Sequence, residues 1–310
     1  MTNLTSTILC AVLASASLTA DTTINNQTAS PVRMTVTANI QKDKRAPEIT
    51  KADVSVNKGK QRLEVLDWTP AKGDQAGLEL FFLIDDSSSW RIGGQLQELR
   101  DFINTQAPAT AIGVGYARNG TVEIVQNFTA DHELAAKALR LPLGYAGAYG
   151  SPYLSVTDLI KHWPETANRR EVVLISDGID RAHRGRNALT NPDVDTAARA
   201  AQRTGSTIHT IYFPGVGHAR HNYFVATYGQ NGLAKLSDLT GGETFSLLLH
   251  TPVSFAPYLG ELERVLDNQY ILTVAARPGR KASLQNITVK TEVAGVDFST
   301  PDAVWVPAAK

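Results

Sequence analysis

Cysteine is almost absent from this chain. Cys10 is the only one in 310 residues, and it lies in an N-terminal stretch that we expect to be removed. Without it, the chain can form no disulfide, carry out no thiol chemistry and build no zinc site from thiolates.

Net charge and long apolar runs are missing as well. The 30 Lys and Arg residues balance 30 Asp and Glu residues, so charge gives no reason to expect binding to nucleic acid or to an anionic membrane. No apolar run is long enough for a mature membrane-spanning helix, and we expect no integral membrane span. A hydrophobic content of 43% and a charged content of 19% are typical of an ordinary globular protein.

The first 20 residues predict a secretory signal peptide. Residues 8–20 are small and apolar, they carry no charged side chain, and Ala14-Ser15-Ala16 offers a cleavage site. Only the amino terminus supplies the positive charge that usually precedes such a stretch. We expect export to a secreted, periplasmic or cell-envelope location, with a polar linker over residues 21–31.

The most informative stretch is Leu78–Trp90, which reads LELFFLIDDSSSW. Its apolar part is typical of a strand buried on both faces of a parallel sheet, and it stops at two carboxylates and three hydroxyls. Asp85, Ser87 and Ser89 follow the spacing Asp-x-Ser-x-Ser. Asp86 cannot start the same pattern, because a tryptophan falls where its second serine is needed. These hard oxygen atoms suit Mg²⁺ or a similar cation, although a polar strand end followed by a helix cap is an alternative.

Strands and helices alternate from residue 78 to residue 267. Expected strands cover residues 78–85, 109–117, 122–128, 170–178, 206–214 and 243–248, and expected helices cover residues 95–105, 131–141, 152–163, 192–204, 232–239 and 256–266. This alternation predicts an α/β fold of Rossmann-like character, in which a doubly wound, mostly parallel sheet carries helices on both faces.

Short β-like pieces flank this region at residues 32–75 and 268–308, and one of them is an expected strand over residues 283–293. Few strands make no stable core alone, so two separate β appendages would each be too small. We therefore expect the two segments to pair into one small β-sandwich, with the α/β domain of residues 78–267 inserted between them.

Two further loops offer oxygen ligands for a metal at the strand ends. Asp177 ends the strand of residues 170–178 and precedes Gly178, which permits a tight turn. Ser151 opens a helix between a glycine and a proline. Ligands in open α/β sheets bind beyond the carboxyl ends of the strands, where these loops are expected to meet.

The order of these motifs resembles the von Willebrand factor A domain, and a Leu-Thr-Gly-Gly turn at residues 239–242 adds to the likeness. Nearly the whole mature chain is similar to the exported bacterial group called VWFA-related domain proteins. The resemblance implies a metal-ion-dependent adhesion site for Mg²⁺, or for Mn²⁺ or Ca²⁺. Its ligands would be Asp85, Ser87, Ser89, Ser151 and Asp177. The family usually has threonine where Ser151 stands, so the oxygen is kept and a methyl group is lost.

The resemblance also implies a function, which is binding to a protein partner whose Asp or Glu completes the metal coordination. Only two of the five ligands are carboxylates, so the bound cation would accept a third from outside. Trp90, Tyr149 and Tyr153 are candidates for an aromatic rim, and the basic loop Arg181–Arg186 for steering an acidic partner. Ordinary packing and a solvated loop are the alternatives.

We expect no enzymatic activity. A structural or assembly protein with metal-independent contacts is the alternative function, and a Mg²⁺-dependent phosphoester hydrolase is a minor one, because no phosphate cradle follows the first strand. His209 lies mid-strand and is expected to be buried and hydrogen-bonded. His218 and His221 lack the glutamate and the helix of a zinc protease.

Overall fold

A computed structural model describes residues 29–40, 47–145, 147, 149–182, 191–216, 222–246 and 251–309. The expected signal peptide, most of the basic loop after Ala182, and both His218 and His221 lie outside the described residues.

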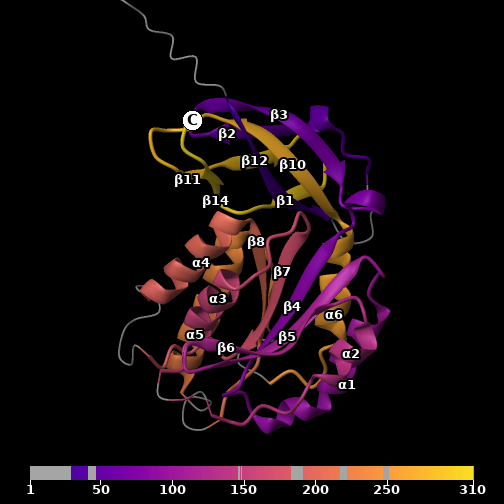
Figure 1. Cartoon of the computed structure of the whole chain (residues 1–310), viewed down its shortest axis with the longest axis vertical. Helices are drawn as coiled ribbons and strands as arrows, with labels where there is room; N and C mark the ends of the chain where they lie inside the picture. The colour runs from indigo at the N-terminus through magenta and orange to yellow at the C-terminus, as the bar shows by residue number, and fades with distance from the viewer. Residues whose placement is uncertain are drawn as a thin grey trace, which may run out of the picture.

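A central six-stranded sheet forms the larger part of the molecule (Figure 1). Its strands, in spatial order, are β6 (Thr121–Thr129), β5 (Thr110–Arg118), β4 (Leu78–Asp85), β7 (Arg169–Ser176), β8 (Ser206–Tyr212) and β9 (Thr244–Phe245). All neighbours pair in parallel except β6, which is an antiparallel edge. The predicted α/β fold with a mostly parallel sheet is confirmed.

Strand β4 lies between β5 and β7 inside the sheet, and every one of its residues is buried. Successive side chains point to opposite faces of a strand, so β4 supplies two cores at once. Phe82 and Ile84 belong to the core on one face, and Phe81 and Leu83 to the core on the other. A continuous apolar run is what a strand covered on both faces requires.

Three helices cover each face of this sheet. They are α1 (Leu96–Thr105), α2 (His132–Lys137) and α6 (Ala256–Asp267) on the β4 face that carries Phe82, and α3 (Pro152–Lys161), α4 (Pro192–Thr204) and α5 (Tyr223–Thr240) on the face that carries Phe81. Helix α4 has the expected bounds, because Asn191 caps its start and Gly205 ends it at a φ of 67°.

Helix α5 is longer than expected. It begins at Tyr223, where Asn222 accepts a hydrogen bond from the Val225 N–H, rather than at Gly232. Tyr223 and Phe224 are exposed, so the first turn lacks the apolar face toward the core that sequence periodicity detects. Helix α2 is shorter than expected and ends at Lys137.

A second six-stranded sheet joins the two ends of the chain. In spatial order its strands are β12 (Thr288–Thr291), β2 (Val54–Lys58), β3 (Gln61–Pro70), β10 (Gln269–Ala276), β1 (Ser30–Ile40) and β13 (Val296–Ser299). The antiparallel register of β1 and β10 runs from Ser30 opposite Ala276 to Thr37 opposite Gln269. Residues from both ends share one hydrophobic core, which includes Val36 and Leu272.

Residues 283–293 form two strands where the sequence predicts one. Strand β11 (Ser283–Asn286) pairs with β14 (Ala303–Val306) in a separate two-stranded sheet, whereas β12 joins the six-stranded sheet through β2. Strand β13 was not expected from the sequence. The β-sandwich itself stays a prediction, since β11 and β14 make only a two-stranded second sheet.

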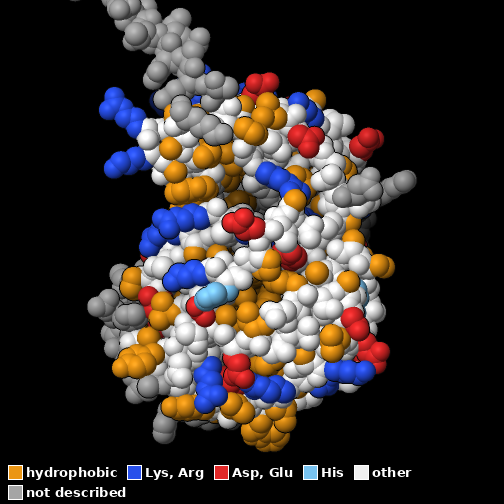
Figure 2. All heavy atoms as spheres, viewed as in Figure 1, with side chains coloured by type: hydrophobic (Ala, Val, Ile, Leu, Met, Phe, Trp, Pro, Cys, Tyr) orange, Lys and Arg blue, Asp and Glu red, His pale blue; other side chains and the backbone are white. Residues whose placement is uncertain are grey.

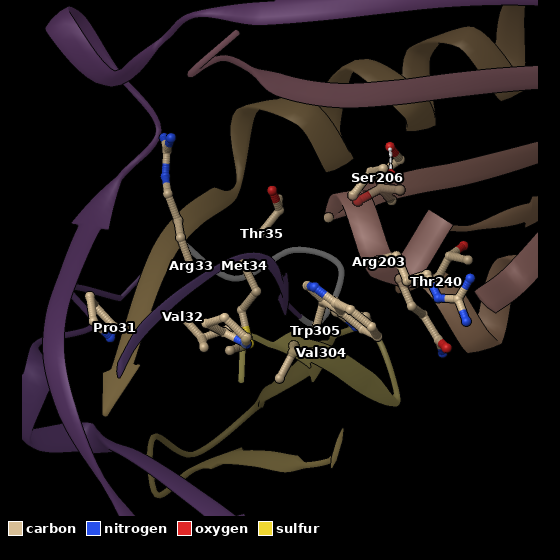
Figure 3. Close-up of a pocket in the computed structure, with 16 residues that line it drawn as sticks. Pro31, Val32, Arg33, Met34, Thr35, Arg203, Ser206, Thr240, Val304 and Trp305 are labelled. Atoms are coloured by element: carbon tan, nitrogen blue, oxygen red, sulfur yellow. Dashed lines mark hydrogen bonds between the residues drawn. The ribbon is translucent and has the colours of Figure 1, made fainter. Parts of the chain in front are cut away.

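The second sheet packs against the amino ends of the parallel strands (Figure 1). Buried Arg169 fastens this junction, because its guanidinium donates to the carbonyl oxygens of Leu266 at 3.4 Å and Ala76 at 3.3 Å and to the Gln269 side chain. A cavity of about 200 Å³ remains beside the start of β8. Figure 3 shows that Trp305 reaches into this region, and the Arg203 guanidinium lies 5.3 Å from its ring centre.

None of the helices in the described part of the chain has the length and apolar character needed to cross a membrane.

Replacing Arg169 tests whether the junction stabilises the fold. We expect Arg169→Ala to lower the free energy of unfolding by about 2–4 kcal/mol, because buried carbonyl groups lose their donor. Arg170→Ala is the matched control, since this neighbour on β7 is partly exposed and bonds only the Pro164 carbonyl; we expect a loss of under about 1 kcal/mol. Urea denaturation measures both, and equal losses would contradict the role given to Arg169.

Candidate metal centre

The three predicted loops meet at the carboxyl edge of the central sheet. Strands β4 and β7 are parallel neighbours with Ile84 opposite Ile175, so their ends at Asp85 and Ser176 lie side by side. Each predicted ligand is nearly inaccessible to solvent. These are Asp85, Ser87, Ser89, Ser151 and Asp177.

Asp85 is held by hydroxyl and amide groups from two strands. Its Oδ1 accepts from the Ser87 N–H at 2.8 Å and the Ser87 hydroxyl at 2.6 Å, and its Oδ2 accepts from the Ser176 hydroxyl at 2.7 Å. Burial raises the pKa of Asp85 above its ordinary value, and the Asp177 carboxylate raises it further, while Arg181 and the two serines act in the opposite direction. The two acidic groups are therefore close enough to repel each other.

The third loop turns sharply after Asp177. Gly178 has a φ of 69°, and a Cβ there would lie 2.2 Å from the Gly229 carbonyl oxygen on α5. Glycine is required both for this left-handed conformation and for the close approach of α5. The same turn lets the Ile179 N–H donate to Asp177 Oδ1 at 2.9 Å.

Arg181 neutralises Asp177 in this structure. Its Nη2 lies 2.6 Å from Asp177 Oδ2, and its Nη1 lies 3.3 Å from Oδ1. Burial lowers the pKa of Arg181, but the charge of Asp177 and its hydrogen bonds raise it more. Arg181 is thus an inward-facing partner of Asp177 rather than a solvated residue that steers a ligand.

Ser89 and Ser151 act as helix caps. The Ser89 hydroxyl accepts from the Arg91 N–H at the start of a 3₁₀ helix, Trp90–Gly94, and Ser151 accepts from the Leu154 N–H at the start of α3. Both bonds are long, at 3.4 Å, and therefore weak. The helix-cap alternative is thus realised for Ser89, and Ser151 caps α3 as well. Neither weak bond prevents the oxygen from accepting a cation.

Asp86 belongs to a different pair, as the register argument requires. Its carboxylate lies 2.8 Å and 3.2 Å from the two terminal nitrogens of Arg140 and also accepts the Leu143 N–H at 3.0 Å. The second acidic residue of the motif is therefore occupied in holding the loop that precedes α3.

The donor set fits a hard divalent cation. It combines two carboxylates with three hydroxyls, which are oxygen ligands of the kind that Mg²⁺ prefers. Within the described residues, no group of three or more His, Cys, Asp and Glu side chains could hold a metal, so a cation here depends on the serines. Glycine at position 215 lets the Asp177 carboxylate lie against the backbone there, since a Cβ would lie 2.3 Å from Asp177 Oδ2 and 3.2 Å from the Ser87 carbonyl oxygen.

Sequence reasoning missed Ser176 and Gly215. Ser176 links the loops, because its hydroxyl donates to Asp85 and accepts the Gly178 N–H at 2.9 Å. The signal was a hydroxyl directly before the strand-ending Asp177. Gly215 follows β8 and carries no local signal, since only the folded sheet brings it to Asp177.

Of the three candidates for an aromatic rim, two are exposed and the third is packed in the core, which is the alternative for that residue. Trp90 and Tyr149 are 69% and 70% exposed. Tyr153 is buried, because it faces the sheet from α3 and donates to the Gly178 carbonyl oxygen at 2.8 Å. Figure 2 shows apolar side chains gathered at the lower end of the molecule, away from the second sheet. Other exposed apolar residues on the loops and helix starts at this edge are Leu141, Leu143, Tyr145, Val216, Tyr223, Phe224 and Val253.

His209 is a structural residue, as the sequence predicts. It is fully buried, its Nε2 lies 2.6 Å from Glu171 Oε2, and its Nδ1 accepts the Glu243 N–H at 3.1 Å.

No family model matches the sequence, and no curated protein does. Solved structures similar to this chain include von Willebrand factor A domains. A von Willebrand factor type A protein from Catenulispora acidiphila is 10% identical, with 92% of this chain and 75% of that chain covered and a TM-score of 0.46. The vWF domain of the type V pili tip protein Mfa5 from Porphyromonas gingivalis is 13% identical, with 64% and 94% covered and a TM-score of 0.42.

A third similar structure is an aerotolerance-related membrane protein from Bacteroides fragilis, 12% identical, with 62% of this chain and 99% of that chain covered and a TM-score of 0.44. The order of the strands, with one antiparallel edge on an otherwise parallel sheet, is what defines the fold here.

Replacing Gly178 tests the tight turn behind Asp177. We expect Gly178→Ala to lower the free energy of unfolding by about 2–5 kcal/mol, from left-handed strain plus the clash with Gly229. Gly205→Ala is the control, since Gly205 has a φ of 67° and nothing within 4 Å of its Cβ position. It should cost only about 1–2 kcal/mol. Chemical denaturation compares the two variants. Equal losses in the free energy of unfolding would show that the close approach of α5 does not add to the cost of the substitution.

Proposed function

We propose that this chain binds a protein partner through a divalent cation held by Asp85, Ser87, Ser89, Ser151 and Asp177. Mg²⁺ is the first choice, with Mn²⁺ or Ca²⁺ as alternatives. The supporting observation is that Asp85 and Asp177 are both buried at the adjoining ends of the paired strands β4 and β7, where the charge of Asp177 adds to the effect of burial in raising the pKa of Asp85. A cation between them would offset both the lost hydration and the mutual repulsion.

The charge balance favours an acidic partner. Asp86 is neutralised by Arg140, and Arg181 supplies one positive charge for Asp85 and Asp177. A divalent cation would by itself cancel the charges of Asp85 and Asp177, so the cluster would no longer repel an acidic side chain. When bound, the cation supplies a coordination position that a partner Asp or Glu can fill.

The chain's own residues would prepare the site before any partner arrives. Ser87 and Ser176 fix the orientation of Asp85, and the turn at Gly178 fixes Asp177. Around them, Trp90 and Tyr149 offer exposed aromatic surface, which is common at protein interfaces. A partner that presents an acidic side chain with apolar neighbours would match this surface.

The proposal includes export by the signal peptide of residues 1–20, followed by action in the cell envelope or outside the cell. The proposed function is binding and not catalysis.

The affinity for Mg²⁺ distinguishes the role of Asp85 from that of its neighbour Asp86. We expect Asp85→Asn to abolish Mg²⁺ binding, because it removes one of the two charges, and Asp86→Asn to keep the affinity within about threefold, because Asp86 faces Arg140. Isothermal titration with MgCl₂ measures both variants against the unchanged protein. Loss of binding in the Asp86 variant alone would reverse the proposed register.

Partner binding should require both the cation and the rim. In pulldowns from an envelope extract of the source cells, we expect EDTA or Asp85→Ala to abolish capture of the partner. Trp90→Ala should weaken its capture about tenfold without changing Mg²⁺ affinity. Quantitative mass spectrometry of the captured proteins is the measurement. Capture that survives both EDTA and Asp85→Ala would favour the metal-independent assembly role.

A further inference from the structure

Arg181 occupies the carboxylate that a cation would use. It meets Asp177 with two nitrogens, at 2.6 Å and 3.3 Å, which is the two-pronged geometry of a strong Arg–carboxylate pair. Its Nη1 also donates to the Ile179 carbonyl oxygen at 3.2 Å, and its backbone N–H donates to the Gly150 carbonyl oxygen at 2.7 Å. The guanidinium is therefore bound within the loop that holds Asp177, and the backbone of Arg181 ties this loop to the one that holds Ser151.

There is little room for a third group at this point. A Cβ on Gly215 would lie 2.3 Å from Asp177 Oδ2 and 3.1 Å from Arg181 Nη2. The ion pair thus lies directly against the backbone that follows β8. A cation bound to Asp177 would lie close to the Arg181 guanidinium. The two positive charges would then repel each other and compete for the same carboxylate.

We propose that Arg181 is a built-in competitor of the divalent cation, which neutralises Asp177 in the cation-free protein and leaves this carboxylate when a cation binds. The inference rests on the proposed function, because it concerns the regulation of the same site. As a consequence, the cation concentration needed to occupy the site is higher than it would be without Arg181. An acidic partner can bind only once that concentration is reached.

The exposure of the two groups shows which one moves. The Asp177 side chain is 2% exposed, whereas that of Arg181 is 17% exposed and lies on the solvent side of the pair. An arginine has a long stem that lets its charged end reach water while the stem stays packed. When a cation replaces Arg181 at Asp177, the arginine side chain therefore turns outward and Asp177 stays in place beside Asp85.

The experiment measures the affinity for Mg²⁺ by isothermal titration of the full chain at low ionic strength. Arg181→Gln removes the competing charge and should bind Mg²⁺ at least about tenfold more tightly than the unchanged protein. Arg91→Gln is the charge-matched control, since Arg91 is exposed beside the first loop and makes no ion pair among the described residues. It should change the affinity by less than about threefold.

Thermal unfolding gives a second readout. In EDTA, Arg181→Gln should melt below the unchanged protein, because Asp85 and Asp177 then repel each other without a counter-charge. Saturating Mg²⁺ should close this difference. Arg181→Lys keeps the charge without the two-pronged bond, so its Mg²⁺ affinity should fall between those of the other two; it also serves if the glutamine variant does not fold.

The outcomes separate this inference from the proposed function. Tighter Mg²⁺ binding by Arg181→Gln but not by Arg91→Gln supports the competitor role, even if the unchanged protein binds no Mg²⁺ at all. Unchanged or weaker binding by the Arg181 variants overturns the inference and leaves the metal site standing. Absence of Mg²⁺ and Mn²⁺ binding in every variant overturns both.

Discussion

Two buried negative charges at one edge of a sheet are the constraint on which the site depends. Parallel pairing of β4 and β7 places the ends of both strands together; β4 ends at Asp85, and Asp177 follows the last residue of β7. A charge removed from water needs a partner. Asp86 is paired with Arg140 and Asp177 with Arg181. Among the described residues, Asp85 is hydrogen-bonded by the hydroxyls of Ser87 and Ser176 and by the Ser87 amide, and it shares the charge of Arg181 with Asp177 without an ion pair of its own. The remaining imbalance at Asp85 is what makes a cation chemically reasonable here.

The second sheet lies away from this edge (Figure 1). The second sheet, built from both ends of the chain, covers the amino ends of the parallel strands, where Arg169 fastens it (Figure 1). The carboxyl ends therefore lie at the opposite end of the molecule (Figure 1), where the proposed ligand side chains are buried and apolar side chains such as Trp90 and Tyr149 are exposed. This separation lets one end of the domain serve stability while the other remains available for binding.

Elements with strong local signals were predictable. An uninterrupted apolar run indicated β4, and the Asn191 cap with Gly205 at the far end marked both bounds of α4. Predictions were wrong where the local sequence pattern did not match the fold. The start of α5 has no apolar face toward the core, and residues 283–293 are divided between two sheets although their pattern is that of a single strand. Tyr153 was assigned to the rim because sequence does not show which way a helix faces.

The sequence by itself determined the α/β class, the central position of β4 and the order of the oxygen-bearing loops, since these depend on periodicity and spacing along neighbouring residues. It also separated Asp85 from Asp86. Only the tertiary structure decided which charges meet. Arg140 lies 54 residues from Asp86 in sequence, and Gly215 reaches Asp177 only because β8 pairs with β7. Arg181 is near Asp177 in sequence, yet its inward orientation follows from the hydrogen bond of its backbone to Gly150. Pairing of buried charges depends on distances across the fold, and local sequence patterns do not encode those distances.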